Sequence, residues 1–561
     1  MALERNSEHG LPQVTLEVYE QDYRDRHLLH GAVAYWAARA PEAPALIHHE
    51  RGRTTTWKEL EQISTRLAAS LLRLGFRKGD FLAALMPFSA EHIFLEYACF
   101  KIGLIHAPLD LRLRAPEVLR AIRQLPARGF AFSGRIGASD LRDLAQTVRR
   151  ECPSVECLIQ CPPLGEAPDG AIPFPRLLDD PQPSPPRLAE DVTEHDPAQA
   201  IFTTGSTGSP KAALLSHRNI TCQNLCLGAA FGFGPQTRLL VNLPPSHVGG
   251  QAEALMTTLF WGGTAVALEI FDPARSLDAI ERHKVNLLGQ IPAMYQYQWR
   301  LPDFESRHLE SLAMAIYGGQ QAPRPFLERL ARMAPRIGTG LGLTEAAGFC
   351  TYTPPNAGVD QIQASLGFAM PMYPLSIRQP MRPDGTAGEE LPEGEIGHVC
   401  FQGPQTFLGY VGDPEATAAA ISRDGILYTG DLGSRRPDGL HFAGRAKWVI
   451  KPAGHQVFPA DVENHFCRLE KVANCAVVGV EHPLLSEAIV AFVEPHSGAE
   501  LTVEELRRHA RQIASYMRPL HYVLLPAGQM PYNRAAKPDY VALKQMARQQ
   551  AEALGWPQNR S

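Results

Sequence analysis

The chain has 561 residues, of which 45% are hydrophobic and 20% charged, the composition of an ordinary globular protein. Its 54 basic and 59 acidic residues give a formal net charge of −5 without a dense basic run, so nucleic acid is not an expected partner. No apolar stretch approaches the roughly 18 residues of a membrane span, and the polar first ten residues lack the apolar core of a signal peptide. We therefore expect a cytoplasmic protein without a transmembrane segment.

The first third of the chain alternates predicted helices and strands. Thr56 and Glu59 form a capping box, and apolar residues then recur at helical spacing. Predicted strands follow at residues 81–86 and 105–109, with a predicted helix at 91–102 between them. This alternation predicts an α/β fold, with largely parallel or mixed sheets covered by helices.

The ten cysteines predict buried, reduced thiols rather than a metal site. Only Cys152, Cys157 and Cys161 form a cluster, at irregular spacing and without a nearby histidine. Zinc sites instead place cysteines and histidines at short, regular spacings. Reduced thiols agree with a cytosolic protein.

The run from Thr203 to Lys211 is the most informative segment of the chain, and it lies between two predicted short strands. Its glycines allow backbone N–H groups to approach an anion, its hydroxyls can donate to phosphate oxygens, and its lysine adds positive charge. A Walker A loop is excluded, because Pro210 stands where that motif has its second glycine and Ala212 follows the lysine. We predict a phosphate-binding loop with the candidate residues Thr203, Thr204, Gly205, Ser206, Thr207, Gly208 and Lys211.

The order of predicted helices and strands changes after Arg445. A strand is predicted at residues 448–451, and a helix follows at 459–469. Later segments predict strands at 473–480, 488–493 and 522–525 and a helix that begins at Thr502. We predict a small α+β domain at residues 446–561 that follows a large N-terminal domain at residues 1–445.

The predicted phosphate loop resembles the signature of the adenylate-forming superfamily, which contains acyl-CoA synthetases, luciferase and the adenylation domains of peptide synthetases. Further motifs resemble those of the superfamily and follow its order, at residues 244–250, 317–323, 340–345, 428–431 and 531–537. The resemblance covers the chain from about residue 54 to about residue 544. It implies that the large domain holds ATP and the acyl group, and that the small domain is a mobile lid.

The resemblance also implies roles for single residues. His247 would border the acyl pocket, Thr344 would contact the α-phosphate, Glu345 would help to hold Mg²⁺, and Lys537 would be the catalytic lysine of the lid. A hydroxyl suits an oxyanion, and a carboxylate suits a hard cation. The implied nucleotide contacts are Gly318, Gly319, Gln320, Leu341, Gly342, Asp431 and Arg445. In a second orientation of the lid, which pivots near Lys447, Lys451 and Gly454 would face the site.

Three residues depart from the superfamily pattern. Leu341 stands where an aromatic residue commonly stacks on adenine. Ala212 and Ala536 replace glycines, and an alanine is strained wherever φ must be positive.

The implied activity is ATP-dependent ligation of a carboxylic acid to coenzyme A through an acyl-AMP intermediate, with Mg²⁺ as cofactor. The stretch from Pro244 to Gln251 contains no acidic residue, which disfavours an amino acid as substrate. The candidate lining is small, so we expect a fatty or other apolar acid; it comprises Gly249, Gly250, Ala252, Ala346, Ala347 and Gly348. Two alternatives stay open: an acyl-AMP ligase that loads a carrier protein, and a non-catalytic nucleotide-binding relative.

Overall fold

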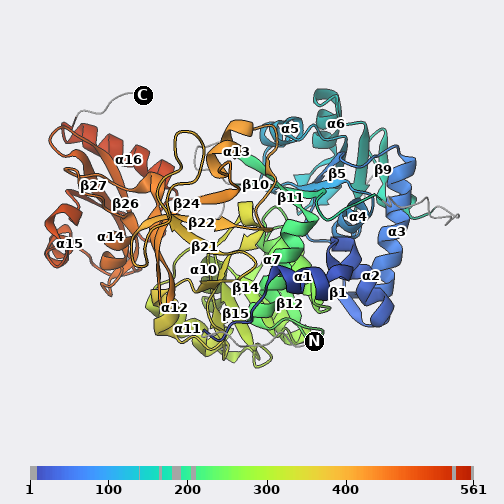
Figure 1. Cartoon of the computed structure of the whole chain (residues 1–561), viewed down its shortest axis with the longest axis horizontal. Coiled ribbons are helices and arrows are strands. Elements are labelled where there is room, and N and C mark those ends of the chain that lie inside the picture. The colour runs from blue at the N-terminus through green and yellow to red at the C-terminus, as the bar shows by residue number, and fades with distance from the viewer. Residues whose placement is uncertain are drawn as a thin grey trace.

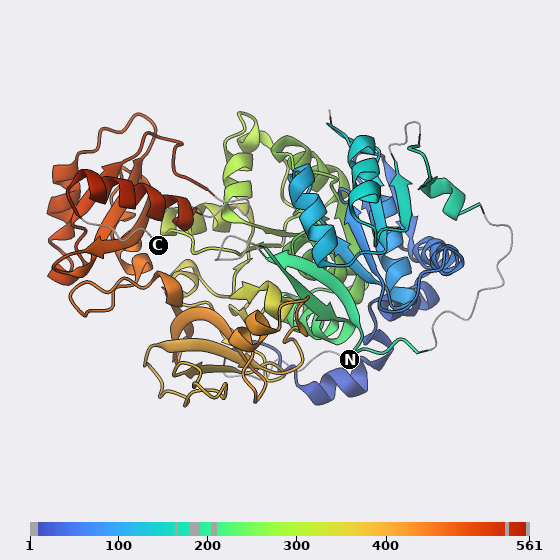
Figure 2. The same cartoon turned by 90° about the horizontal axis from the view of Figure 1, so that it is seen from above.

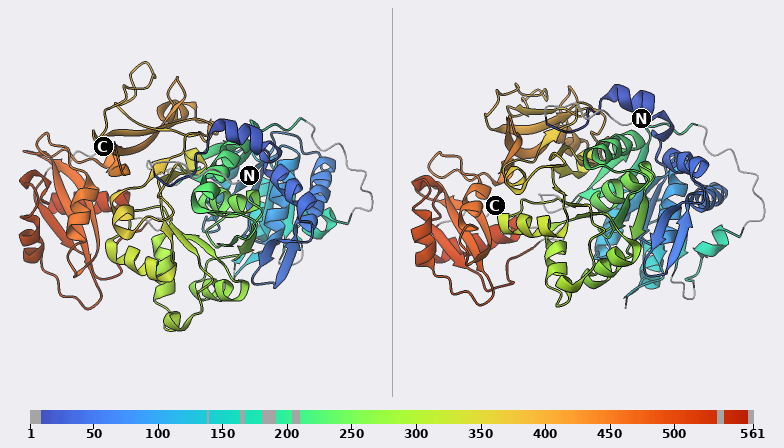
Figure 3. Two further views of the ribbon diagram at one scale, coloured as in Figure 1. Left: turned by 60° about the horizontal axis from the view of Figure 1, so that its bottom comes forward. Right: turned by 90° about the horizontal axis from the view of Figure 1, so that it is seen from below.

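The computed structural model describes residues 9–137, 139–162, 167–179, 191–203, 210–532 and 538–556. The chain forms a large N-terminal domain and a smaller C-terminal domain, which lies at one end of the longest axis (Figure 1). The views from above and below show the same arrangement, with the small domain beside the large one (Figures 2 and 3). The predicted fold class is thus confirmed.

Two large sheets form the body of the N-terminal domain. The first has the order β16-β15-β14-β12-β13-β1-β2, and all its neighbours are parallel except β1 and β2. Its strands are β1 (Pro44–His48), β2 (Arg53–Thr56), β12 (Arg238–Val241), β13 (Thr264–Ala267), β14 (Leu287–Gln290), β15 (Met314–Tyr317) and β16 (Ile337–Gly338).

The second sheet has the order β23-β11-β10-β4-β3-β5-β8-β9. It is parallel except around β11, which runs antiparallel to both of its neighbours. Its strands are β3 (Phe81–Leu85), β4 (Ile105–Pro108), β5 (Gly129–Ser133), β8 (Cys157–Cys161), β9 (Ala171–Pro173), β10 (Pro197–Thr203), β11 (Lys211–Ser216) and β23 (Gly409–Tyr410).

Helices fill the space between the two sheets and cover their outer faces. Every residue of α4 (Ala90–Lys101) is buried, and α7 (His217–Phe231) is buried along nearly its whole length. One apolar cluster joins these two helices to both sheets, so they form a central layer. Separate clusters hold the outer helices: α5 (Ala115–Gln124) and α6 (Arg142–Glu151) on the second sheet, and α9 (Pro273–His283), α10 (Pro292–Trp299) and α11 (Arg324–Met333) on the first.

A smaller antiparallel sheet completes the N-terminal domain. It has the order β21-β22-β24-β25, with β21 (Leu375–Arg378), β22 (Gly397–Gln402), β24 (Ile426–Arg436) and β25 (Gly439–Arg445). The remaining α-helices of this domain are α1 (Leu16–Asp22), α2 (Leu29–Arg39), α3 (Trp57–Arg73), α8 (Thr257–Phe260), α12 (Val359–Ala364) and α13 (Pro414–Ala420), and η3 (Gly249–Met256) is a π-helix. Three short strand pairs are β6 (Arg135–Ile136) with β7 (Ser139–Asp140), β17 (Gly342–Leu343) with β18 (Gly348–Phe349), and β19 (Thr351–Tyr352) with β20 (Phe368–Ala369). Several 3₁₀ turns connect these elements.

The C-terminal domain packs helices on both faces of a three-stranded sheet. In this sheet β27 (Ser486–Pro495) pairs antiparallel with β26 (Val472–His482) and parallel with β28 (His521–Leu524). The helices α14 (Pro459–Phe466) and α15 (Val503–Ala510) share one apolar cluster, and α16 (Tyr540–Ala553) lies in another.

Most predicted elements are confirmed, including the helix after the Thr56–Glu59 capping box and the helix capped by Thr502. The predicted strand at residues 448–451 is wrong. A 3₁₀ turn, η6 (Ala446–Trp448), stands there, followed by an isolated bridge between Ile450 and Val457. The helix α16 was not predicted from the sequence.

The thiols and the helix lengths agree with the sequence analysis. All ten cysteines are free, and nine are buried. Among the helices of the described ranges, none combines the length and the apolar character that a membrane crossing needs.

Candidate functional site

The strands β10 and β11 hold the two ends of the predicted phosphate loop together. Thr203, the last residue of β10, pairs with Lys211, the first residue of β11. The predicted loop residues Thr204, Gly205, Ser206, Thr207 and Gly208 lie outside the described residues, so their role stays a prediction. Ala212 opposite Phe202 lies in regular antiparallel pairing and does not have a positive φ, so the concern about strain at this alanine is removed.

Tyr410 connects Lys211 with Glu345. The strand β23, which carries Tyr410, pairs with β11 next to Lys211. The Lys211 Nζ lies 5.3 Å from the centre of the Tyr410 ring and 3.7 Å from Oδ2 of Asp413. The Tyr410 hydroxyl donates a hydrogen bond of 2.6 Å to Oε1 of Glu345. Burial, and then the charge of Glu345, raises the pKa of Tyr410, so this phenol stays a proton donor.

Sequence analysis missed Tyr410 and Asp413. They lie about 200 residues beyond Lys211 in the chain, in the segment 409–413 that no motif of the analysis covers. Only the pairing of β23 with β11 brings them to the loop. Glu345 itself lies in the 3₁₀ turn η5 (Thr344–Ala346) and is half-buried, so its carboxylate is a suitable hard ligand for Mg²⁺. Thr344 begins the same turn.

The predicted ribose residues face each other across a β-hairpin. Asp431 of β24 lies opposite Arg445 of β25 in the sheet register. The Arg445 Nε lies 2.8 Å from Oδ1 of Asp431, whose side chain is 1% exposed while that of the arginine is 45% exposed. Thr429 donates from its hydroxyl to Val399 O and accepts from the Asp431 N–H, which fixes the backbone at this position.

The predicted adenine residues lie at the carboxyl end of β15, where ligands bind in parallel α/β sheets. Gly318 follows directly after this strand, and Gly319 has a φ of +90°, a conformation that favours glycine. Gln320 is exposed beside them. Leu341 is buried, and its N–H donates to the Thr351 hydroxyl. The exposed Gly342 begins β17 after it.

The predicted acyl residue His247 precedes a rare helix type. Its side chain is exposed, and its Nδ1 accepts a hydrogen bond of 2.9 Å from the Gly249 N–H. Residues 249–256 then form the π-helix η3. Its Ala252 carbonyl accepts hydrogen bonds from the Asn224 amide and the Thr257 hydroxyl, which stabilises the wider turn. Single π turns of this kind occur frequently at functional sites.

Glu253 of this π-helix lies among the predicted acyl-pocket residues, and sequence analysis missed it. A Cβ added to Gly249 would lie 3.3 Å from Oε2 of Glu253 and 3.0 Å from Nδ1 of His247. A Cβ added to Gly348 would lie 2.7 Å from Oε1 of Glu253. The carboxylate therefore occupies the space beside glycines of both lining segments. The position of Glu253 could have been predicted only if residues 249–256 had been recognised as a π-helix.

The electrostatic setting of Glu253 is unusual. Burial raises the pKa of its carboxyl to about 8, although the backbone N–H of Phe349 donates a hydrogen bond that lowers it. The side chain nevertheless keeps accessible surface and is half-buried. It forms no ion pair with any residue of the described ranges. A carboxylate in this setting is suited to receive a hydrogen-bond donor or a cation.

In the small domain, the predicted residues Lys451 and Gly454 lie beside the β26–β27 turn. The Lys451 N–H donates to Glu487, and Ala453 next to Gly454 donates to Leu485, so their contacts are with the β26–β27 turn. Burial, and then the nearby Arg445, lowers the pKa of the predicted pivot Lys447 to about 8. Lys537 and Ala536 lie outside the described residues, and their predicted effects stay predictions.

Comparison with models of protein families shows the family to which the chain belongs. The model of the AMP-binding enzyme family matches residues 33–411, which is more than half of the chain. The chain belongs to the AMP-binding enzyme family. The model of the AMP-binding enzyme C-terminal domain matches residues 461–537, within the small domain.

Relatives and solved structures agree with this membership. The chain is 31% identical to a feruloyl-CoA synthase from Amycolatopsis sp, over 86% of this chain and 92% of the relative. It is 27% identical to 4-coumarate–CoA ligase 3 from Arabidopsis thaliana, over 87% and 85% of the two chains. These AMP-binding relatives are acyl-CoA ligases by name.

The solved structures confirm the fold. ATP-bound MatB from Rhodopseudomonas palustris superposes with a TM-score of 0.80 at 24% identity, covering 93% of this chain and 99% of that one. The amide bond synthetase McbA from Marinactinospora thermotolerans also has a TM-score of 0.80, at 26% identity, covering 92% and 99%.

Proposed function

We propose that this protein is an ATP-dependent ligase that joins a carboxylic acid to the thiol of coenzyme A through an acyl-adenylate. The observation that carries the proposal is the position of Tyr410, which lies beside the Lys211 ammonium and donates to the Glu345 carboxylate. The predicted phosphate-binding cation and the predicted metal-binding carboxylate thus contact the same residue. Two relatives support the same chemistry, because one is named a feruloyl-CoA synthase and the other a 4-coumarate–CoA ligase.

In the proposed first step, an oxygen of the substrate carboxylate attacks the α-phosphorus of ATP, and the bond to the β-phosphate breaks to release pyrophosphate. The protein must align the reactants and stabilise charge rather than supply a nucleophile. The Thr344 hydroxyl would donate to the α-phosphate, and Glu345 would hold Mg²⁺, which supplies positive charge to the phosphate oxygens. Lys537 would place its ammonium between the carboxylate and the α-phosphate.

In the proposed second step, the thiol sulfur attacks the acyl carbon, AMP leaves and the thiol loses its proton. We propose that the small domain then turns about Lys447, which would bring Lys451 and Gly454 to the site. Their present contacts with the β26–β27 turn leave the two residues on the surface of this domain, where such a rotation can reorient them. The domain limits of 1–445 and 446–561 belong to this proposal.

Two alternatives lead to different measurements. A carrier-protein ligase shares the first step, and one relative, 29% identical, is named fatty acid–[acyl-carrier-protein] ligase ScoC from Streptomyces coeruleorubidus. A non-catalytic nucleotide-binding relative would bind ATP without turnover. The test is a panel of carboxylic acids in which AMP release is measured with CoA, with a phosphopantetheinylated carrier protein, and with neither thiol.

CoA-dependent AMP release with at least one acid supports the proposed ligase. Release that requires the carrier protein instead identifies the first alternative. ATP binding without AMP release under every condition overturns the catalytic proposal.

For the acid itself, the small residues of the candidate lining favoured a fatty or other apolar compound, and the lack of an acidic side chain at residues 244–251 disfavoured an amino acid. Glu253 lies just beyond that stretch, and its carboxyl adds one polar group to the otherwise small, apolar lining. We infer an acid with an apolar body and one hydrogen-bond donor or cationic group that reaches Glu253. A polar group built to pair with a substrate donor rejects the analogue without it, since the half-buried carboxyl then lacks that partner.

Matched pairs of acids test this inference. 4-Hydroxycinnamic and cinnamic acid differ in one hydroxyl, and 6-aminohexanoic and hexanoic acid differ in one amine. We expect kcat/KM to be at least tenfold higher for the donor-bearing member of one pair, and Glu253→Leu to remove that difference. Equal kcat/KM within every pair, together with activity on these acids, would overturn the role of Glu253 without affecting the proposed ligase activity.

A further inference from the structure

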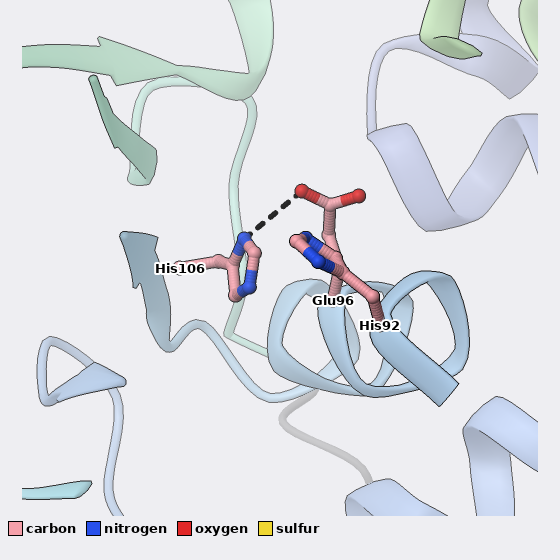
Figure 4. Close-up of side chains that lie close together, drawn as sticks. All are labelled: His92, Glu96 and His106. Atoms are coloured by element: carbon pink, nitrogen blue, oxygen red, sulfur yellow. Dashed lines mark ion pairs between the residues drawn. The ribbon is translucent and has the colours of Figure 1, made fainter. Parts of the chain in front are cut away.

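A second polar cluster lies in the central layer, away from the residues that the proposed reaction uses. His92 and Glu96 are one turn apart on α4, and His106 lies on the neighbouring strand β4 (Figure 4). All three side chains are fully buried. Each offers one ligand atom, and these atoms lie within 4.8 Å of one another. We propose that His92, Glu96 and His106 bind a divalent transition-metal ion, with Zn²⁺ as the expected ion.

The hydrogen bonds of His92 prepare it for such a role. Its Nδ1 lies 3.1 Å from the Pro87 carbonyl oxygen, an acceptor, so this nitrogen carries the proton. The Nε2 atom is then left as a lone-pair donor that can bind a metal. Histidine ligands of metals almost always donate their other ring N–H to a carbonyl or carboxylate in this way.

Unsatisfied polar atoms converge on the same place. His106 Nδ1 lies 2.9 Å from Oε1 of Glu96, but among the described residues neither ring nitrogen of this histidine has a hydrogen-bond partner of good geometry. Oε2 of Glu96 also lacks a partner in this part of the chain. Buried polar groups are normally paired, and an unpaired one destabilises the folded state. A cation would satisfy the carboxylate and both imidazoles at once.

Two glutamine side chains surround the cluster. The Gln199 amide donates to Oε1 of Glu96 at 2.8 Å, and the Gln251 amide nitrogen lies 3.4 Å from Nε2 of His92. The oxygens of both amides are buried, and neither has a partner among the residues that the structure describes. A rotated amide could therefore provide a fourth, oxygen ligand beside the three proposed ones.

The donor set selects the class of metal. Two imidazoles and one carboxylate suit Zn²⁺ and its transition-metal neighbours, whereas Mg²⁺ and Ca²⁺ prefer oxygen ligands alone. Burial lowers the pKa of His92 to about 4 and that of His106 to about 3, so both rings are neutral, as metal binding requires. Burial also raises the pKa of Glu96 to about 7, a cost that a bound cation would relieve.

The position of the cluster suggests a structural role. Gln199 belongs to β10, which leads into the predicted phosphate loop, and Gln251 belongs to the π-helix that also carries Glu253. A metal ion between α4 and β4 would hold these segments together from within. None of the three proposed ligands is a residue that the proposed reaction uses, so the inference is independent of the proposed ligase activity.

The experiment measures the metal content of the untagged full-length protein after purification and gel filtration. Elemental analysis should find about one Zn²⁺ per chain, removed by a strong chelator and restored by Zn²⁺ alone. His106→Gln and Glu96→Gln should each lower retained Zn²⁺ at least tenfold. His308→Gln, which changes an exposed histidine, is the matched control and should keep it.

X-ray absorption at the zinc edge of the wild-type protein covers the case in which a variant fails to fold. A shell of nitrogen and oxygen scatterers supports the proposed site. Sulfur scatterers would assign the zinc to cysteines and overturn it. Retention of zinc by the two cluster variants, or less than about a tenth of an ion per wild-type chain after reconstitution, would also overturn it, leaving a hydrogen-bonded His–Glu network in the core.

Discussion

At the scale of single residues, the site depends on side chains that neutralise or direct charge. Glu345, Tyr410 and Lys211 form one connected group through the Tyr410 ring and hydroxyl. Asp431 and Arg445 form a second group on the neighbouring hairpin. Lys537, outside the described residues, is the predicted third element.

The Tyr410 hydroxyl can be tested by Tyr410→Phe. The variant removes a hydrogen bond to a charged group, which is worth about 1.5–3 kcal/mol, so we expect acid-dependent pyrophosphate exchange to fall roughly 10- to 100-fold. The effect should include a higher Mg·ATP requirement, because Glu345 loses its orienting partner. Tyr297→Phe, at an exposed tyrosine, is the control. Exchange within twofold of wild type would show that Tyr410 does not position Glu345.

The predicted catalytic lysine is tested by Lys537→Ala. One preorganised donor to transition-state charge typically contributes about 10²–10³ in rate, so adenylation should fall by that factor while ATP binding persists. Pyrophosphate exchange and ATP binding are measured on the same preparation. An exchange rate within threefold of wild type would remove Lys537 from the catalytic role.

The raised pKa of Glu253 makes a prediction about stability and pH. Because its pKa is about 8 in the folded protein and near 4.5 when unfolded, protonation favours the folded state. This contribution is fully present below the unfolded pKa and is lost as the pH rises through about 8.

Glu253→Gln should therefore lose less stability than wild type between pH 5 and pH 8, as urea unfolding at each pH can measure. The exposed Glu504→Gln is the matched control and should follow wild type. Parallel curves for wild type and Glu253→Gln would show that this carboxyl is not desolvated in the folded chain.

At the scale of elements, two backbone features position the acyl side of the site. The π-helix η3 turns Gln251 toward His92 and brings Glu253 to the strand pair β17–β18. In β18, Gly348 has a φ of +131° and leaves room for the Glu253 side chain. The packing of the π-helix η3 against the strand pair β17–β18 therefore requires a glycine at position 348.

Gly348→Ala tests the dependence. The new methyl group would lie 2.7 Å from Cγ of Glu253 in a conformation that alanine rarely adopts, so we expect a loss of about 1–3 kcal/mol in the free energy of unfolding. Gly358→Ala is the control, because its added Cβ meets nothing within 4 Å and its φ is not positive. Equal urea midpoints for the two variants would contradict the close contact between Gly348 and Glu253.

At the scale of the whole molecule, the small domain contacts the large one near the predicted adenine residues. An amide hydrogen bond of 3.4 Å joins Asn464 of α14 to Gln321 after β15. The connection between the domains is the 3₁₀ turn at Ala446–Trp448, where the Lys447 ammonium lies 4.4 Å from the centre of the Trp448 ring. A short connecting turn is suited to absorb a domain rotation.

Lys447→Pro tests the proposed pivot. Proline fixes φ near −65° and removes the N–H donor, so one domain orientation should be locked. We expect adenylation, measured by pyrophosphate exchange, to be spared, and CoA-dependent consumption of preformed acyl-AMP to fall at least about tenfold. Lys447→Ala controls for the loss of the charge alone. Equal retention of both half-reactions would place the pivot elsewhere, and equal loss would indicate a misfolded small domain.

Local patterns in the sequence determined much of this protein. The capping boxes at Thr56 and Thr502, the strands on either side of the phosphate loop and the α/β class depend on contacts within a few residues, which periodicity reports directly. The residues of the Asp431 and Arg445 motifs were also predicted, because each lies in a recognisable short pattern. What failed was the strand at 448–451. Its apolar residues 448–450 are consecutive, and the structure places the first of them in a 3₁₀ turn and joins Ile450 to Val457 by an isolated bridge.

Only the tertiary structure decided which distant residues meet. Tyr410 reaches Glu345 because β23 pairs with β11, and His106 reaches Glu96 because β4 lies beside α4. Glu253 lies in the predicted acyl lining because the π-helix directs its side chain there. Gly249 and Gly348 leave space for its carboxylate. Such contacts depend on strand order and on the volume left by neighbours, and neither quantity is present in the spacing of residues along one segment of the chain.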